Sequence, residues 1–271
     1  MKDILFENVN FSYPGSGPVL EHIDLKISSG EQIALMGHNG AGKTTLAKLI
    51  NGLLSPTSGN VWIGSMNTKE HTTANIAHHV GYVFQNPDDQ IFHSTVEKEI
   101  GFCRKILKQK GQDSKARIDE ALQMTGMGEY RRKNPFDLPL SLRRFVAMAS
   151  VLAMDPDIVI FDEPTAGQDL NGRNTLIEIF RKLKEKGKTV IVISHDMDFI
   201  FEHFDKLIVM ANKEILFYGT RQDAFQTPEL FRKANLEPPC ISILCQHFGI
   251  EAADVETAAK LICDKWADLT R

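Results

Sequence analysis

Residues 37–45 read GHNGAGKTT. They lie between a short apolar run, EQIALMG, and a segment, TLAKLINGLL, whose apolar residues recur at helical spacing. A turn of this kind between a strand and a helix, with Gly42 followed by Lys43 and Thr44, fits the pattern G-x-x-x-x-G-K-[S/T] of a phosphate-binding loop. The glycines allow backbone N–H groups to surround a polyphosphate at the helix N-terminus. We expect Lys43 to reach the outer phosphates and the Thr44 hydroxyl to bind Mg²⁺.

The composition is that of an ordinary globular protein with one large α/β domain, or one domain with a small appendage. Of the 271 residues, 42% are hydrophobic and 24% charged, and the net charge of −4 gives no sign of a nucleic-acid partner. The segment MKDILFENVNFSYPG lacks the pattern of a signal peptide, and no window of about 18 apolar residues predicts a membrane span. The four cysteines form no C-x-x-C pair, so we expect reduced thiols in a cytosolic protein.

Strand-like and helical segments alternate along most of the chain, which predicts a largely parallel sheet with crossover helices. The alternating segments ILFENVNFSY and VLEHIDLKIS predict a second, smaller antiparallel sheet. Residues 87–154 are mostly helical in pattern, with Ser94 and Glu97 as an expected capping box. The helix after the phosphate-binding loop is expected to bury the four residues Leu46, Leu49, Ile50 and Leu53.

The last fifty residues differ in character, because a Pro-Pro break is followed by two helical segments. In the second segment one face carries Val255, Ala258, Ala259, Ile262, Cys263 and Trp266. This stripe predicts either packing against the rest of the chain or a dimer contact.

Polar residues end several other apolar runs. Asp162 and Glu163 follow IVIF; in a nucleotide-binding protein Asp162 could hold the water shell of Mg²⁺ and Glu163 could polarise an attacking water. His195 ends VIS, where it could reach the γ-phosphate or be a structural histidine. Gln85 follows VGYVF, and its amide could bind Mg²⁺ and orient water. Tyr13 could stack on adenine or simply cover the small sheet.

Together these residues resemble the ATP-binding subunit of ABC transporters over about the first 220 residues. The resemblance implies a P-loop ABC ATPase core, made of a mostly parallel sheet and a small antiparallel β-subdomain, with ATP and Mg²⁺ bound. The segment TAGQD, ending in Asp169, corresponds to the D-loop. By resemblance the catalytic residues are Glu163, His195 and Gln85; the nucleotide-binding residues are Tyr13, Gly37, His38, Asn39, Gly40, Ala41, Gly42, Lys43, Thr44, Thr45 and Asp162; and the magnesium ligands are Thr44, Gln85 and, through water, Asp162.

The segment VFQNPDDQIF, residues 83–92, resembles the energy-coupling factor branch of this family in particular, whose members drive uptake of vitamins and of cobalt or nickel ions. The resemblance implies an ATPase domain over residues 1–220, with a helical subdomain at about 87–154 that receives a membrane T-component. Residues 221–271 would form a helical extension that contributes to dimerisation. The implied partners are a second ATPase subunit, often non-identical, the T-component and a substrate-binding S-component. The chain would be peripheral, at the cytoplasmic face of the cell membrane.

One family motif is degraded. The ABC signature L-S-G-G-Q aligns with residues 138–142, here LPLSL, which we call the signature segment. In the family this segment contacts the γ-phosphate held by the other subunit. Pro139 has neither a hydroxyl nor an N–H group, and Leu140 adds bulk where a phosphate must approach. The pattern predicts an asymmetric heterodimer, since a homodimer would have the defective segment at both sites.

Three alternatives remain from the sequence. The chain could be a nucleotide-binding subunit with little or no hydrolysis. It could be a non-transport ABC ATPase, although such proteins usually carry two cassettes or long coiled-coil insertions. Finally, Arg143 or Arg144 could turn toward the phosphate and replace the missing contacts.

Overall fold

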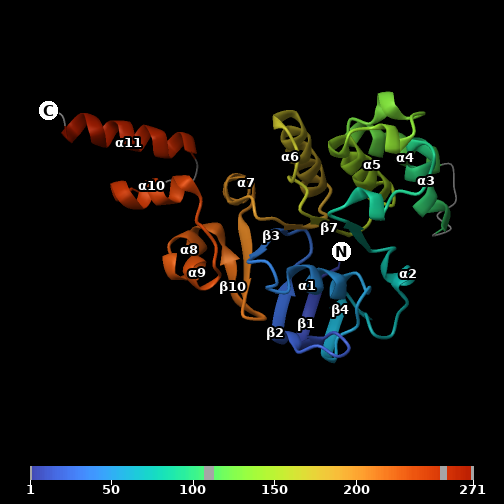
Figure 1. Ribbon diagram of the computed structural model, residues 1–271, viewed down its shortest axis with the longest axis horizontal. Coiled ribbons are helices and arrows are strands. Elements are labelled where there is room, and N and C mark those ends of the chain that lie inside the picture. The colour runs from blue at the N-terminus through green and yellow to red at the C-terminus, as the bar shows by residue number, and fades with distance from the viewer. Residues whose placement is uncertain (1, 107–112, 251–254, 270–271) are drawn as a thin grey trace.

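The computed structural model describes residues 2–106, 113–250 and 255–269 and contains two sheets with helices packed around them (Figure 1). The strands are β1 (Ile4–Ser12), β2 (Pro18–Ile27), β3 (Gln32–Gly37), β4 (Ser58–Ile63), β5 (Met66–Asn67), β6 (Val80–Val83), β7 (Ile158–Asp162), β8 (Thr189–Ile193), β9 (Lys206–Ala211) and β10 (Glu214–Thr220). The helices are α1 (Lys43–Ile50), α2 (Thr73–Ile76), α3 (Val96–Ile106), α4 (Asp113–Met124), α5 (Leu140–Leu152), α6 (Leu170–Glu185), α7 (Met197–His203), α8 (Arg221–Phe225), α9 (Pro228–Lys233), α10 (Cys240–Phe248) and α11 (Val255–Leu269).

The larger sheet has the strand order β10-β9-β3-β8-β7-β6. Its strands run parallel except for the edge strand β10, which pairs antiparallel with β9. The smaller sheet is antiparallel, with the order β2-β1-β4-β5. Both predictions made from the alternation of strands and helices are therefore confirmed.

The larger sheet is covered on both faces, which explains why its strands read as continuous apolar runs. On β7, Ile158 and Ile160 pack toward α1 and the smaller sheet, whereas Val159 and Phe161 pack toward the helices of the other face. Successive side chains of a strand point to opposite faces, so one short run contributes to both cores. The sheet is thus fixed from both sides, and its carboxyl edge is a rigid place for a site.

Two local predictions were wrong. Helix α1 ends at Ile50, and Leu53 lies beyond it with 48% of its surface exposed, because the chain turns at Asn51 and Gly52. The expected capping box at Ser94 does not form. Thr95 instead accepts a hydrogen bond from the N–H of Lys98 at the start of α3 (3.3 Å).

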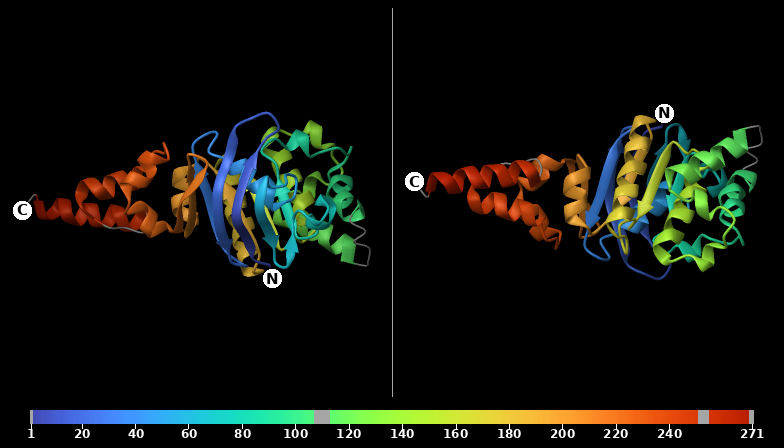
Figure 2. Two further views of the ribbon diagram at one scale, coloured as in Figure 1. Left: turned by 90° about the horizontal axis from the view of Figure 1, so that it is seen from below. Right: turned by 90° about the horizontal axis from the view of Figure 1, so that it is seen from above.

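The segment between β6 and β7 carries α3, α4 and α5, which lie together at one end of the molecule (Figure 1). Helices α10 and α11 extend away from the sheets at the opposite end (Figure 2). Of the apolar stripe expected on α11, Ala258 is buried, whereas Ala259 and Cys263 are exposed. The side chains of Val255 and Trp266 lie outside the described residues. The dimer contact proposed for this stripe stays a prediction.

Candidate nucleotide-binding site

The strand order brings four chain segments to one edge of the larger sheet. Strands β3, β8, β7 and β6 are neighbours and run parallel, so their carboxyl ends meet there. The phosphate-binding loop follows β3, His195 follows β8, Asp162 ends β7, and Gln85 follows β6. This arrangement brings together residues that are more than 150 positions apart in the sequence.

The phosphate-binding loop depends on glycine at particular positions. Gly42 is the residue before α1 and has a left-handed backbone (φ 101°), with no side-chain cap on the helix. A Cβ at Gly42 would lie 2.6 Å from Leu20 Cδ2, and one at Gly37 would lie 2.4 Å from the carbonyl oxygen of Met210. A side chain at Gly37 would therefore collide with the backbone, and the left-handed backbone at Gly42 favours glycine there. The first N–H groups of α1 are left to bind an anion.

Lys43 spans the loop from inside. Its Nζ donates to the carbonyl oxygens of Gly37 (2.7 Å) and His38 (3.0 Å), and the side chain is buried. Burial lowers the pKa of Lys43, and the carboxylates of Glu163 and Asp162 act in the opposite direction. A buried ammonium near the loop is suited to meet the negative charge of phosphate.

Asp162 is held by two hydroxyl groups. Its Oδ2 accepts from Tyr82 Oη (2.7 Å) and from Thr44 Oγ1 (3.4 Å). Burial, followed by the charge and hydrogen bond of Asp162, raises the pKa of Tyr82 far above its usual range, so the phenol stays a donor. Sequence reasoning missed Tyr82. A tyrosine within a buried strand was its only signal, because the partner comes from the neighbouring strand β7.

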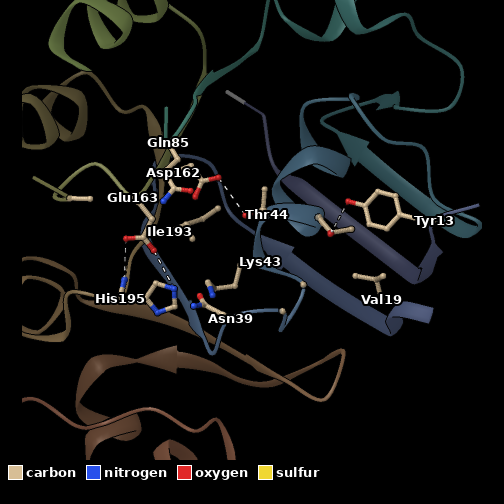
Figure 3. A pocket seen from close by; sticks show the side chains of 14 residues that line it. Tyr13, Val19, Asn39, Lys43, Thr44, Gln85, Asp162, Glu163, Ile193 and His195 are labelled. Carbon is tan, nitrogen blue, oxygen red and sulfur yellow. Dashed lines mark hydrogen bonds and ion pairs between the residues drawn. The ribbon is translucent and has the colours of Figure 1, made fainter. Parts of the chain in front are cut away.

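Glu163 and His195 face each other across the end of β7 and β8 (Figure 3). Glu163 Oε1 lies 3.4 Å from His195 Nε2, and the N–H of His195 lies 3.4 Å from Glu163 Oε2. Burial raises the pKa of Glu163 to about 6, and the N–H of His195 opposes this rise. Burial and the charge of Lys43 lower the pKa of His195. The imidazole is therefore largely neutral near pH 7.

These residues enclose a cavity of about 600 Å³, a size suited to a small ligand (Figure 3). Its lining consists of Tyr13, Val19, Asn39, Gly40, Gly42, Lys43, Thr44, Thr45, Gln85, Asp162, Glu163, Ala166, Ile193 and His195. Val19, Ala166 and Ile193 were missed from the sequence, because apolar residues give no chemical signal. Three expected residues do not line it: Gly37 and His38 instead supply carbonyl oxygens to Lys43, and Ala41 is buried within the core.

Tyr13 lies at the outer end of this cavity and is 40% exposed. Its ring packs edge-on against Phe11 (centroids 4.9 Å apart), and its hydroxyl lies 3.3 Å from Thr45 Oγ1. The ring is therefore fixed beside the phosphate-binding loop while one part of it stays open to a ligand. This geometry accommodates both expectations for Tyr13, covering the small sheet and presenting a ring to a base.

The signature segment lies at the start of α5, whose capping residue is Pro139 without a side-chain cap. Leu140 is 46% exposed, and no residue of 138–142 belongs to the lining of the cavity described above. Arg143 pairs with Asp88 (2.7 Å), and Arg144 donates to backbone carbonyls of the turn after β7. Both arginines are thus bound within their own chain, which argues against the idea that either one turns toward a phosphate.

Residues 20–166, more than half of the chain, match the family described as ABC transporter. The chain belongs to this family. It is 38% identical over 242 residues to the energy-coupling factor transporter ATP-binding protein EcfA of Methanocaldococcus jannaschii, covering 89% of this chain and 87% of that protein. It is likewise 38% identical over 255 residues to a Methanosarcina mazei protein provisionally described as an ABC transporter ATP-binding protein. That match covers 94% of this chain but 43% of the relative, so the chain spans less than half the length of that protein.

Solved structures agree with this assignment. CbiO1 of Clostridium perfringens, part of the ABC transporter complex CbiONQ, superposes with a TM-score of 0.75 at 31% identity, covering 90% of this chain and 98% of CbiO1. A dimeric ATP-binding cassette bound to ADP and phosphate gives a TM-score of 0.73 at 26% identity, over 80% of this chain and 98% of the cassette. The chain therefore has the fold of an ATP-binding cassette and belongs with the ATP-binding proteins of energy-coupling factor transporters. Each helix in residues 2–106, 113–250 and 255–269 is too short or too polar to cross a bilayer.

Proposed function

We propose that this chain is one half of an asymmetric ATPase pair that energises an energy-coupling factor importer for a vitamin or a transition-metal ion. The observation that carries the proposal is a contrast within the chain. The loop before α1 has the glycines and the lysine of a phosphate site, whereas the start of α5 has Pro139 and the exposed Leu140 in their place. In an ABC pair these two surfaces serve two different nucleotides.

At the first surface, the phosphates of ATP would lie against the N–H groups of the loop and of α1. Lys43 would exchange its bonds to the loop carbonyls for phosphate oxygens, and Tyr13 would face the adenine. Thr44, Asp162 and Gln85 offer a hydroxyl, a carboxylate and an amide oxygen within one cavity, the kind of ligand that Mg²⁺ prefers. When bound there, the ion would neutralise charge that develops on the phosphates.

Glu163 is the proposed general base for the attacking water. Its carboxylate lines the cavity, and a pKa of about 6 leaves it ionised at neutral pH while keeping it a better proton acceptor than an exposed glutamate. The largely neutral His195 beside it is suited to hydrogen-bond the γ-phosphate or the water. Asp162 stays fixed by Tyr82 and Thr44 while these groups act.

At the second surface, the start of α5 would meet the nucleotide held by the partner. Pro139 provides no N–H or hydroxyl there, and the exposed Leu140 would meet a phosphate with a methyl-rich surface. The loss of one or two charge-assisted hydrogen bonds would slow hydrolysis at that nucleotide by about a hundredfold. The competent site would combine this chain's loop with an intact signature from a non-identical partner.

The remaining parts of the proposal rest on the family. Residues 1–220 would form the ATPase domain, residues 87–154 its helical subdomain for the T-component, and residues 221–271 an extension for dimerisation. An S-component would select the substrate, and the assembly would hold this chain at the cytoplasmic face of the membrane. The relatives EcfA and CbiO1, which are named as parts of transporters, support transport over the non-transport alternative.

The test is Mg-ATP hydrolysis by the purified chain over a wide range of protein concentration, with Glu163→Gln as the blank. We expect ATP to bind with very slow hydrolysis. A restored-signature variant, Pro139→Ser with Leu140→Gly and Ser141→Gly, should hydrolyse ATP at a rate that rises faster than linearly with concentration. Leu142 is left in place because it packs against the core.

Two results would go against the proposal. In the first, the unaltered chain hydrolyses ATP substantially, at a rate that rises faster than linearly with protein concentration, and Glu163→Gln does not. This result would mean that the signature segment is functional as it is. A restored-signature variant that dimerises with ATP but still hydrolyses nothing would favour the second candidate, a nucleotide-binding subunit with no hydrolysis of its own. The degraded signature segment is the observation behind that candidate.

A further inference from the structure

The N-terminal half of α5 contacts the edge of the sheet that carries Glu163 through the side chain of Arg144. The Nη1 of this residue donates to the carbonyl oxygen of Glu163 (3.2 Å) and also to that of Ala166. These two carbonyls mark the beginning and the end of the turn of residues 163–166, which leads from β7 toward α6. One guanidinium thus fixes both ends of the turn.

This turn begins with a strained backbone. Glu163 has a positive φ of 51°, which a residue with a Cβ rarely adopts because it is sterically strained. Such a conformation persists only where the surroundings hold it. The N–H of Glu163 donates to the carbonyl oxygen of Ile193 (2.8 Å), and the N–H of Ala166 donates to the carbonyl oxygen of Glu163 (3.3 Å). The bond from Arg144 to the same Glu163 carbonyl adds a charged donor to this set.

The direction of the Glu163 side chain depends on this conformation. With the positive φ, the carboxylate turns back along the sheet edge and into the cavity, opposite His195 (Figure 3). If the backbone relaxed to a negative φ, the Cα–Cβ bond would point in another direction and the carboxylate would leave the line to the phosphates. A second contact supports the same junction, because Gln168 Nε2 donates to the carbonyl oxygen of Ser141 on α5 (3.2 Å).

We propose that Arg144 is a positioning residue that holds the backbone of Glu163 in its left-handed conformation and so aims the carboxylate at the bound nucleotide of the same chain. On this view α5 serves the chain's own site even though its signature segment no longer suits a phosphate. The inference rests on the proposed function in one respect, the role of Glu163 as general base.

The test compares Arg144→Met, which removes every donor but keeps a long side chain, with Arg144→Lys, which keeps a single charged donor group. The matched control is Arg131→Met. Arg131 also joins two segments through two partners, Glu97 and Asp119, but it does so in the helical region away from the cavity. Three quantities are measured on the full chain: amide hydrogen exchange of residues 163–168 without nucleotide, the dissociation constant of Mg-ATP, and the hydrolysis rate in the restored-signature background.

We expect the amides of Ala166 and Gln168 to exchange at least about tenfold faster in Arg144→Met, by a smaller factor in Arg144→Lys, and unchanged in Arg131→Met. The dissociation constant of Mg-ATP should stay within about threefold of wild type, because Lys43 and its loop are untouched, while hydrolysis falls at least about tenfold. If Arg144→Met does not fold, Arg144→Lys carries the same three readings.

The inference is overturned if exchange in residues 163–168 is no faster than in Arg131→Met, or if nucleotide affinity falls as much as the rate. Failure of the proposed function is detected by the hydrolysis assay and not by hydrogen exchange. It would show as rapid hydrolysis by the unaltered chain or as a restored-signature variant without activity, and neither result changes the exchange measured without nucleotide.

Discussion

Helices α1 and α5 begin in a similar way, yet only one start is suited to a phosphate. Neither has a side-chain cap, and each presents unpaired N–H groups at the positive end of a helix dipole. Before α1 lies Gly42, in a loop whose backbone favours glycine at positions 37 and 42, with Lys43 buried behind it. Before α5 stands Pro139, followed by the exposed Leu140. The comparison teaches that a helix N-terminus becomes a phosphate site only when the residues around it let the phosphate approach.

The largest expected effect is on hydrolysis at the nucleotide site beside α1. In the restored-signature background, Glu163→Gln should lower hydrolysis by about a thousandfold, within the range that a general base supplies, while ATP still binds. A phosphate-release assay together with equilibrium nucleotide binding measures both quantities. A rate that survives this change would mean that another group activates the water.

Removal of Lys43 tests whether the start of α1 provides the affinity for Mg-ATP. Lys43→Ala should weaken Mg-ATP binding by about a hundredfold, because a buried ammonium bonded to the loop would no longer meet the phosphates. The matched control is Lys48→Ala on the same helix, which should bind nucleotide normally. Equal affinities for the two variants would remove the basis for calling the loop the nucleotide site.

The restored-signature variant tests whether the residues at the start of α5 limit hydrolysis. The restored-signature variant should hydrolyse ATP some tenfold to a hundredfold faster than the unaltered chain, with nucleotide affinity nearly unchanged. Phe136→Ser, which removes a neighbouring exposed apolar residue outside the signature segment, is the control for a general gain in solubility. A similar gain in that control would mean that the exposed apolar surface, and not the lost hydrogen bonds, limits the rate.

A smaller effect concerns the support of Asp162. Tyr82→Phe should lower the free energy of unfolding by about 1–3 kcal/mol. The buried Asp162 carboxylate would lose its shortest hydrogen bond, and the phenylalanine offers no donor to replace it. Urea denaturation of the nucleotide-free chain measures it. Tyr218→Phe provides a comparison, since its hydroxyl donates to the half-buried Glu31 away from the cavity. No loss of stability in Tyr82→Phe would show that Thr44 alone satisfies Asp162.

The smallest effect is a pH dependence of stability. The folded pKa of Glu163, about 6, exceeds its ordinary value of 4.5, so folding favours the protonated form. The stability this provides is fully present below about pH 4.5 and is lost as pH rises through 6, to a total of about 2 kcal/mol. Relative to wild type, Glu163→Gln should therefore gain stability between pH 4.5 and 7 when unfolding is followed in urea with a chelator present. A constant difference between the two proteins would contradict the raised pKa.

Residues with chemical signals could be proposed from the sequence, whereas residues whose role depends on their neighbours in the fold could not. Asp162, Glu163 and His195 could be found because each ends a buried apolar run. Tyr82 could not, since its partner depends on β6 pairing with β7. The four-residue stripe after the loop included Leu53 wrongly, because helical spacing alone does not show where a helix ends.

The amino-acid sequence alone predicts the phosphate-binding loop, the two kinds of sheet and the departure of residues 138–142 from the family signature, because each depends on local spacing or on the chemistry of single side chains. The strand order β3-β8-β7-β6, the hydrogen bond between Tyr82 and Asp162, and the contact of Arg144 with the turn after Glu163 become visible only in the folded chain. Local periodicity specifies which face of a strand is buried, but not which strand lies next to it. That choice follows from the packing of all the elements together.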